Sequence, residues 1–167
     1  MDTVGTMARD ERQWFAEQLD QHRGILVKVA ASYCRHPEDR AELMQDIAVQ
    51  LWQAFPRYDA TRSFSTWMYR VALNVAISSL RRARVPAVPL DDALHDIADV
   101  RARDPAAEQQ VRALHRFIHA QPPLDRALLL LYLEDRAYRE ISEILGLTET
   151  NVATKISRLK QRIRDEL

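Results

Sequence analysis

The sequence YREISEILGLTETNVATKISRLKQRIR, residues 138–164, decides the fold of the C-terminal part of this chain. Its first half places Ile141, Ile144 and Leu145 on one side of a short helix, and Gly146 can adopt the left-handed backbone conformation that ends a helix. Thr148 is a good N-cap for the helix that follows. That helix repeats apolar residues at steps of four, three and four: Val152, Ile156, Leu159 and Ile163. A short helix, a glycine turn and an amphipathic helix together predict a helix-turn-helix.

The opposite face of the second helix is polar and basic. It carries Asn151, Thr154, Lys155, Ser157, Arg158 and Arg162. Small hydrogen-bonding side chains near the start of such a helix suit base edges in the major groove, and the basic side chains suit phosphates or guanine. An ordinary helical hairpin with a solvated basic face is the alternative, but it does not require the amide and hydroxyl groups of Thr150, Asn151 and Thr154. The pattern favours DNA binding.

A second stretch, FSTWMYRVALNVAISSLRRAR at residues 64–84, combines an apolar helix with one polar stripe. The stripe recurs at every fourth position and contains no carboxylate: Thr66, Arg70, Asn74, Ser78 and Arg82. Arginines beside an aromatic residue such as Trp67 suit a single strand whose bases stack and whose phosphates pair with guanidinium groups. For this helix in isolation, a core helix with one wet stripe is the favoured interpretation. The presence of a second basic surface at the C-terminus shifts the balance toward nucleic acid.

Charge is distributed in blocks along a chain whose net charge is zero, with 24 Lys+Arg and 24 Asp+Glu. Residues 60–90 contain five arginines and no acid, residues 91–110 contain six acids and two arginines, and residues 148–167 contain five bases and three acids. The zero total by itself argues against a nucleic-acid-binding protein. The block pattern instead indicates two anion-binding surfaces separated by an acidic segment.

The composition predicts an all-α protein of two small helical domains. Glycine is scarce, at 3 of 167 residues, and good helix formers dominate. Proline and the acidic surplus mark residues 85–105 as a flexible linker between domains at residues 1–84 and 106–167. Besides the helices described above, the patterns predict helices over residues 12–33, 37–55, 106–120 and 125–133.

The remaining residues predict neither an enzyme nor a bound cofactor or metal. His115 and His119 have a spacing that can hold zinc, but with no third ligand in view they are expected to be core or surface histidines. The lone Cys34 excludes an internal disulfide and fits a reducing cytoplasm. No apolar run approaches the roughly 18 residues of a membrane span, and residues 1–10 lack a signal-peptide pattern. We therefore expect a cytoplasmic protein without direct membrane insertion.

The two motifs resemble a known family. AELMQDIAVQLWQAFPRYD at residues 41–59, followed by residues 64–82, resembles region 2 of the extracytoplasmic-function (ECF) sigma factors in the sigma-70 superfamily, and residues 138–164 resemble region 4. The resemblance implies a protein that binds core RNA polymerase at the clamp helices of its largest subunit and at its flap. It would direct the enzyme to the −10 and −35 promoter elements, and an anti-sigma factor would hold it inactive.

The resemblance also assigns roles to residues. Polymerase binding falls to the exposed positions Gln45, Asp46, Val49, Gln50 and Gln53. Recognition of the −10 element falls to Trp67, Arg70, Asn74, Ser78, Arg81 and Arg82, with Asn74 at the asparagine that captures an unstacked base. The −35 element falls to Thr154, Ser157 and Arg158, with Asn151 and Lys155 on phosphates. The linker acids Asp91, Asp92, Asp96 and Asp99 would mimic phosphates in polymerase channels, or would simply be solvated.

Three positions depart from the family pattern. Ala137 replaces the usual Ser or Thr N-cap of the first helix of the motif, at a cost of ~1 kcal/mol. Ala153 replaces a frequent basic residue of the recognition helix. Trp67 and Met68 occupy the positions where primary sigma factors have paired tryptophans, and this difference predicts weak DNA melting. Two other classes stay open: a free-standing helix-turn-helix regulator, and a helical adaptor that binds only protein.

Overall fold

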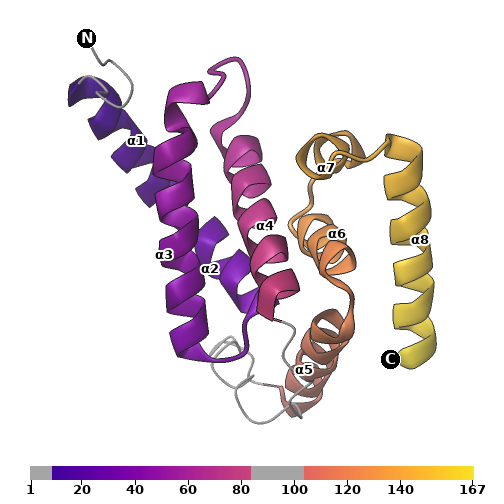
Figure 1. Ribbon diagram of the computed structural model, residues 1–167. Helices are drawn as coiled ribbons and strands as arrows, with labels where there is room; N and C mark the ends of the chain where they lie inside the picture. Colours follow the sequence, from indigo (N-terminus) through magenta and orange to yellow (C-terminus); the bar gives the residue numbers. More distant parts are fainter. Residues whose placement is uncertain (1–8, 84–103) are drawn as a thin grey trace.

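The computed structural model describes residues 9–83 and 104–167, in which every regular element is a helix (Figure 1). The N-terminal unit contains α1 (Arg9–Gln21), α2 (Arg23–Tyr33), α3 (Pro37–Ala54), the short 3₁₀ turn η1 (Phe55–Arg57) and α4 (Phe64–Ala83). The C-terminal unit contains α5 (Pro105–Ala120), α6 (Pro123–Leu133), α7 (Tyr138–Leu145) and α8 (Glu149–Glu166). The all-α class is confirmed. The acidic residues Asp91, Asp92, Asp96 and Asp99 lie outside the described residues.

The prediction of one continuous helix over residues 12–33 is wrong. His22 separates α1 from α2 and has a non-helical backbone, with φ −105° and ψ 19°. The chain turns there because the N–H of Ile25 donates to the carbonyl of His22 at 2.9 Å, which starts a new helix. The break lets α1 change direction, so that Phe15 enters the core and lies 4.6 Å from Phe55, ring centre to ring centre.

Helix α3 begins and ends as its sequence predicts. Pro37 occupies the first turn, where its missing N–H is harmless, and two acids in the same turn face the positive end of the helix dipole. Leu43, Ile47 and Leu51 are fully buried. The proline at position 56 converts the end of the helix into η1, which leads into the turn before α4.

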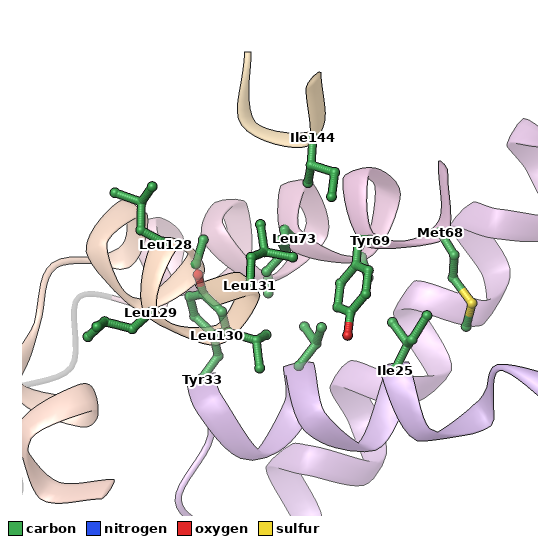
Figure 2. Packing of buried hydrophobic residues seen from close by; sticks show 14 of the residues in the cluster. Ile25, Tyr33, Met68, Tyr69, Leu73, Leu128, Leu129, Leu130, Leu131 and Ile144 are labelled. Carbon is green, nitrogen blue, oxygen red and sulfur yellow. The ribbon is translucent and has the colours of Figure 1, made fainter. Parts of the chain in front are cut away.

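One hydrophobic core runs through both units (Figure 2). Helices α2 and α4 contact α6, and α4 also contacts α7. Leu130 and Leu131 of α6 lie toward Tyr33 of α2 and toward Tyr69 and Leu73 of α4 (Figure 2). Helices α6 and α7 lie between α4 and α8 (Figure 1), so the C-terminal helix is on the outside of the molecule. The packing between the units thus positions the two predicted DNA surfaces relative to each other.

Candidate nucleic-acid interface

The α7–α8 hairpin has the geometry of a helix-turn-helix. Gly146 adopts φ 69° and ψ 31°, the left-handed conformation that ends α7, and its N–H donates to the carbonyl of Ser142 at 2.9 Å. The Thr148 hydroxyl accepts the N–H of Asn151 at 3.1 Å and caps α8. The Ser142 hydroxyl donates to the carbonyl of Leu147 at 2.6 Å, which ties the turn to α7. Each of these features was predicted except the bond of Ser142.

The outer face of α8 is available to a ligand. Val152, Ile156 and Leu159 are buried, as the apolar repeat predicts. The predicted −35 residues lie on the other side: Asn151, Thr154, Ser157 and Arg158 are exposed, and Lys155 is half-buried. The helix therefore presents amide, hydroxyl and basic groups together near its N-terminal end.

Arg162 has a different environment from the other basic residues of α8. Its Nη1 donates to Oε1 of Gln121 at 2.9 Å, and its guanidinium lies 5.4 Å from the ring centre of Phe117. Gln121 is itself buried and donates to the carbonyl of Phe117 at 3.0 Å. Arg162 therefore anchors α8 to the α5–α6 corner, a role that the predicted polar face does not reveal.

The polar stripe of α4 is shorter than predicted. Arg70, Asn74, Ser78, Arg81 and Arg82 are exposed. Thr66, predicted as the first member of the stripe, is only 8% exposed. Its backbone N–H donates a hydrogen bond of 3.4 Å to the hydroxyl of Ser63 in the first turn of the helix. The accessible stripe thus begins at Arg70, one helical turn later.

Trp67 belongs to an aromatic cluster that joins three elements. Its ring centre lies 5.0 Å from Tyr58, 5.4 Å from Phe64 and 6.3 Å from Phe55, and the side chain is half-buried. Trp14 of α1 lies against the same rings, 6.1 Å from Tyr58 in a stacked arrangement, and remains 40% exposed. The sequence does not reveal this cluster, because its members come from α1, from η1 with the adjoining Tyr58, and from α4, with no common spacing.

The turn before α4 is held by its own side chains. The Asp59 carboxylate accepts the N–H of Thr61 at 3.0 Å and its hydroxyl at 2.7 Å, and these hydrogen bonds lower the pKa of Asp59. The Tyr58 hydroxyl donates to the carbonyl of Arg62 at 2.6 Å. A cleft of about 720 Å³ opens beside this turn. Its walls come from both units: Thr61, Arg62, Ser63, Thr66, Arg136, Ala137, Arg139, Glu140 and Glu143.

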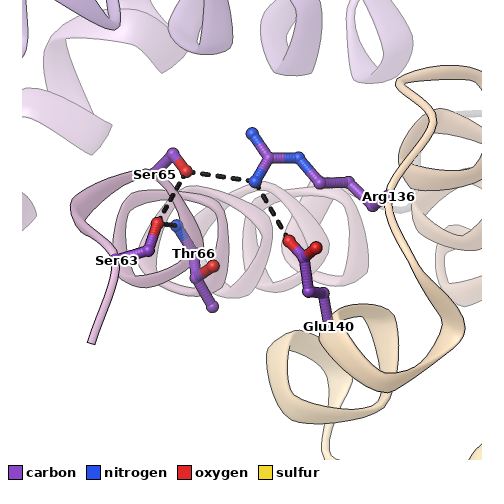
Figure 3. A network of polar contacts seen from close by, with 5 residues as sticks. All are labelled: Ser63, Ser65, Thr66, Arg136 and Glu140. Carbon is purple, nitrogen blue, oxygen red and sulfur yellow. Dashed lines mark hydrogen bonds and ion pairs between the residues drawn. The ribbon is translucent and has the colours of Figure 1, made fainter. Parts of the chain in front are cut away.

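Arg136 crosses this cleft from the α6–α7 turn to α4 (Figure 3). Its Nη1 donates to the hydroxyl of Ser65 at 3.0 Å and to Oε2 of Glu140 at 3.2 Å. Its guanidinium also lies 5.1 Å from the ring centre of Tyr69. A single side chain thus connects the start of the helix-turn-helix with the start of α4.

The predicted polymerase-binding residues share one exposed face of α3. Gln45, Asp46, Val49, Gln50 and Gln53 are all exposed. Trp52 of the same helix is 44% exposed, and its ring centre lies 5.5 Å from that of Phe15. The face therefore combines polar residues with the apolar surface of Val49 and Trp52.

The predicted histidine pair has the character of core residues. His119 is 3% exposed, and burial, with the nearby Arg126 second, lowers its pKa to about 4. Burial and Arg40 lower the pKa of His115. Burial raises the pKa of the Cys34 thiol to about 11, so the thiolate is scarce. No three His, Cys, Asp or Glu side chains gather into a metal site within residues 9–83 and 104–167. Over the same residues, no helix combines the length and apolar character needed to cross a membrane.

The chain matches Sigma-70 region 2 over residues 19–85 and Sigma-70, region 4 over residues 112–163. It is 32% identical to the ECF RNA polymerase sigma factor RpoE of Cereibacter sphaeroides, covering 95% of this chain and 88% of that protein. It is 22% identical to the ECF sigma factor SigW of Bacillus subtilis, covering 98% of this chain and 94% of that protein. RfaY of Xanthomonas campestris pv. campestris is 27% identical, and the chain spans 45% of its length.

Two solved structures share the fold. One is CnrH in complex with the cytosolic domain of CnrY, with a TM-score of 0.67, 20% identity and coverage of 92% of this chain and 87% of CnrH. The other is the sigma factor RpoE of Bartonella quintana in complex with the anti-sigma factor NepR. It has a TM-score of 0.69 and 16% identity, and the match covers 90% of this chain and 94% of that one. On the evidence of its two sequence regions and its relatives, the chain belongs to the extracytoplasmic-function branch of the sigma-70 family, whose members are transcription initiation factors and not enzymes.

Proposed function

We propose that this protein binds core RNA polymerase and directs it to promoters by contacting the −10 and −35 elements. The observation that carries the proposal is the match of region 2 and region 4 in order along one chain, with an exposed polar and basic helix face in each. In this proposal, the domain at residues 1–84 binds polymerase and the −10 element, and the domain at residues 106–167 binds the −35 element. Residues 85–105 form the linker between them.

Helix α4 supplies the −10 surface in this proposal. Asn74 lies in the middle of the exposed stripe, with Arg70 one turn before it and Ser78 one turn after it. An amide at this place can hydrogen-bond an unstacked base, and Arg81 and Arg82 can neutralise phosphates of the same strand. Trp67 borders the stripe as part of the aromatic cluster, and its half-buried side chain is the proposed stacking partner for a base.

Helix α8 supplies the −35 surface. Thr154, Ser157 and Arg158 are exposed on the face opposite the buried apolar repeat, where a recognition helix meets base edges. Asn151 and Lys155 are proposed to contact phosphates. Ala153 contributes no basic group, so in this proposal the −35 preference rests on Thr154, Ser157 and Arg158.

Polymerase binding is assigned to α3. The residues Gln45, Asp46, Val49, Gln50 and Gln53, next to the exposed part of Trp52, form a mixed polar and apolar patch of the kind that partner helices bury. On core polymerase, α3 is proposed to bind the clamp helices, and the flap is the second proposed partner. The linker acids are proposed to mimic phosphates within the enzyme, and the protein is proposed to act in the cytoplasm.

An anti-sigma factor is the proposed regulator. Both solved structures that share the fold hold a second protein, the cytosolic domain of CnrY in one and the anti-sigma factor NepR in the other. A partner of this class would control access to the surfaces on α3, α4 and α8.

Run-off transcription with core polymerase and a varied promoter set tests the proposal. Asn74→Ala should lower promoter-dependent transcript at least about fivefold, because one base contact is worth roughly 1–3 kcal/mol. Binding to core polymerase should be unchanged, since Asn74 is an exposed residue of α4 and is not among the α3 residues assigned to polymerase binding. Gln109→Ala, which removes an exposed amide on α5, is the matched control and should transcribe normally.

Two results would overturn the proposal. No transcript from the wild-type protein on any promoter would exclude a sigma factor. Tight, specific binding of the protein alone to a duplex site would instead indicate a free-standing helix-turn-helix regulator, and binding to protein without any DNA would indicate an adaptor.

A further inference from the structure

We propose that Trp14 of α1 is a further stacking site for the unpaired promoter strand, beyond the base that Asn74 holds. The site is the exposed part of the Trp14 ring, and its ligand is one nucleobase of that strand. The inference deepens the proposed function and rests on it, because it concerns how far the −10 surface extends past α4. The residues assigned to DNA by the family resemblance lie on α4 and α8 alone.

Trp14 contacts three other rings and yet remains exposed. Its ring centre lies 5.8 Å from that of Phe55, 6.1 Å from that of Tyr58 and 5.7 Å from that of Phe64, but 40% of the side chain is accessible. Tryptophan is on average a well buried residue, and an exposed ring that neighbouring rings hold in place is typical of a binding surface. The cluster thus positions Trp14 and leaves part of its ring available to a ligand.

A row of partly exposed rings joins Trp14 to the proposed −10 surface of α4. Trp14 is stacked on Tyr58 with 24° between the ring planes, and the ring centre of Tyr58 lies 5.0 Å from that of Trp67. Tyr58 and Trp67 are half-buried. Figure 1 shows α1 and the turn between α3 and α4 at the same end of the N-terminal unit, where α4 begins. A strand that follows the polar stripe of α4 past Trp67 can therefore continue over Tyr58 to Trp14.

The row offers its outer surface and not the spaces between its rings. A base inserted between two rings needs about 7 Å from ring to ring, because each stacking step takes about 3.4 Å. The distances of 5.0 Å and 6.1 Å between neighbouring ring centres are too short for that. The base must therefore stack on the exposed part of Trp14, as bases do on the aromatic platforms of proteins that bind single strands.

The segment that links Trp14 to α4 carries basic residues suited to phosphates. Arg57 and Arg62 stand on either side of Tyr58 in the chain, and both are exposed. Asp59 lies between them, but its carboxylate is held by two hydrogen bonds to Thr61. The two guanidinium groups can therefore follow the backbone of a strand whose bases face the rings.

The neighbours of Trp14 on its own helix favour a nucleobase over a protein partner. The residues three and four positions away from it are Asp10, Glu11, Glu17 and Gln18. The centre of a protein interface is depleted of charged residues, and this surround does not fit that composition. The acids also repel phosphates, so we expect only a base of the strand to reach α1.

The contact at Trp14 lies a short distance along the strand from the base at Asn74. Trp67 and Asn74 are seven positions apart on α4, which is roughly 10 Å along a helix. The row of rings and the lengths of the side chains bring the separation of Trp14 and Asn74 to at most about 25 Å. A strand with 3.4 Å per stacked nucleotide covers that distance in at most about seven nucleotides.

A cross-link in the wild-type protein tests the proposal directly. The probe is a single-stranded oligonucleotide that carries the −10 sequence of a promoter active in run-off transcription, with 5-iodouracil at one position at a time. It is bound to the complex of core polymerase with the full chain and irradiated, which joins the iodouracil to an aromatic ring stacked on it. Cleavage after arginine places Trp14, Tyr58 and Trp67 in separate peptides, residues 13–23, 58–62 and 63–70. At one position within about seven nucleotides of the base at Asn74, the cross-link should fall on Trp14.

Substitutions of Trp14 separate stacking from packing. Trp14→Leu keeps an apolar side chain against the cluster but has no flat ring, so it should weaken binding of the probe at least about fivefold. Trp14→Phe should bind within about threefold of the wild type. Both variants should bind core polymerase normally in the absence of DNA. Val111→Ala, which removes an exposed apolar side chain from α5, is the matched control and should bind the probe normally.

The salt dependence of probe binding provides a second readout. Trp14→Leu should leave the slope of log K against log salt concentration unchanged, because a stacked base releases no counterion. Arg62→Ala should lower the magnitude of that slope by about 0.7, the value expected for one phosphate of a single strand. A reduced slope in Trp14→Leu would contradict a contact made by stacking alone.

The outcomes distinguish the stacking site from the proposed function. No cross-link to Trp14 at any position, or equal binding of the probe by Trp14→Leu and the wild type, would overturn the site and leave the −10 assignment of Asn74 intact. Weaker binding of Trp14→Leu to core polymerase without DNA would place Trp14 in a protein contact instead. No transcript from the wild-type protein would overturn the proposed function and the site with it. The cross-link needs no variant, so it decides the site even where Trp14→Leu does not fold.

Discussion

His119 is a buried histidine at the contact between α5 and the N-terminal unit. Its ring has a hydrogen bond with the backbone of Ala31, and its Nε2 is buried without a partner. The charged and titratable groups around it are Arg126 of α6, Arg35 between α2 and α3, and His115 of α5. Burial and these cations disfavour a second proton, so His119 is neutral in the folded protein near pH 7.

This environment predicts a loss of stability in acid. An unfolded histidine titrates near pH 6.5, whereas the pKa of His119 is about 4 in the folded chain. Between these values the unfolded state binds more protons, so the free energy of unfolding falls as pH falls from about 6.5 to 4. We expect His119 to account for up to about 3 kcal/mol of that loss, measured by urea unfolding across the window.

The comparison variant is His119→Phe, which keeps a flat ring and removes the titrating group. Its curve of unfolding free energy against pH should be flatter than that of the wild type over this window. Parallel curves would show that His119 is not the source of the acid sensitivity.

At the scale of the element, the two helices of the helix-turn-helix begin differently. Thr148 caps α8 through its hydroxyl, while Ala137 at the start of α7 has the extended backbone of an N-cap, with φ −63° and ψ 148°, and no side chain that can accept a bond. The departure from the family pattern at Ala137 is therefore a missing cap on otherwise suitable geometry.

Two substitutions at these caps should have opposite effects. Ala137→Ser should raise the free energy of unfolding by about 0.5–1 kcal/mol, because the new hydroxyl can accept the N–H of Glu140. Thr148→Ala should lower it by ~1 kcal/mol. Urea denaturation monitored by circular dichroism would measure both changes. Thr150→Ala, an exposed threonine in the first turn of α8, is the control and should have little effect. Equal stability for the two cap variants would contradict the assignment of Ala137 as an empty cap.

At the scale of the whole molecule, the two units share one core, so we expect them to unfold together. Tyr33 shows the coupling at a single hydrogen bond, because it is buried in α2 and its hydroxyl donates to the carbonyl of Pro123 at the start of α6. Burial raises the pKa of this phenol well above its usual range. The phenol therefore stays protonated and remains a donor.

Removal of that hydroxyl should weaken the association of the units. Tyr33→Phe leaves the carbonyl of Pro123 without its partner, and we expect a loss of about 1–2 kcal/mol in the free energy of unfolding. Tyr132→Phe is the matched control, since Tyr132 is half-buried and contacts Lys160 through its ring face. A loss in Tyr132→Phe as large as in Tyr33→Phe would refute a specific role for the hydroxyl of Tyr33.

Features set by neighbouring residues were predictable from the sequence alone. The apolar repeat of α8, the left-handed turn at Gly146 and the cap at Thr148 depend on contacts within a few residues, so their spacing reveals them. The exposed stripe from Arg70 to Arg82 follows from the helical period in the same way. The break at His22 was missed because apolar and polar residues continue through it without a proline or a glycine at the boundary itself.

Other features were decided only when the helices packed. Thr66 is buried, and Trp67 packs against Phe55 of η1 and the adjoining Tyr58. Arg162 binds Gln121, and Arg136 reaches Ser65 across 71 positions of sequence. Each depends on which helices meet, and a helical pattern specifies only that a face is apolar, not the partner that covers it. The sequence by itself thus determined the all-α class, the helices other than the division between α1 and α2, and the family. The tertiary structure decided the distance between the two proposed DNA surfaces, because packing of α6 and α7 against α4 sets that distance.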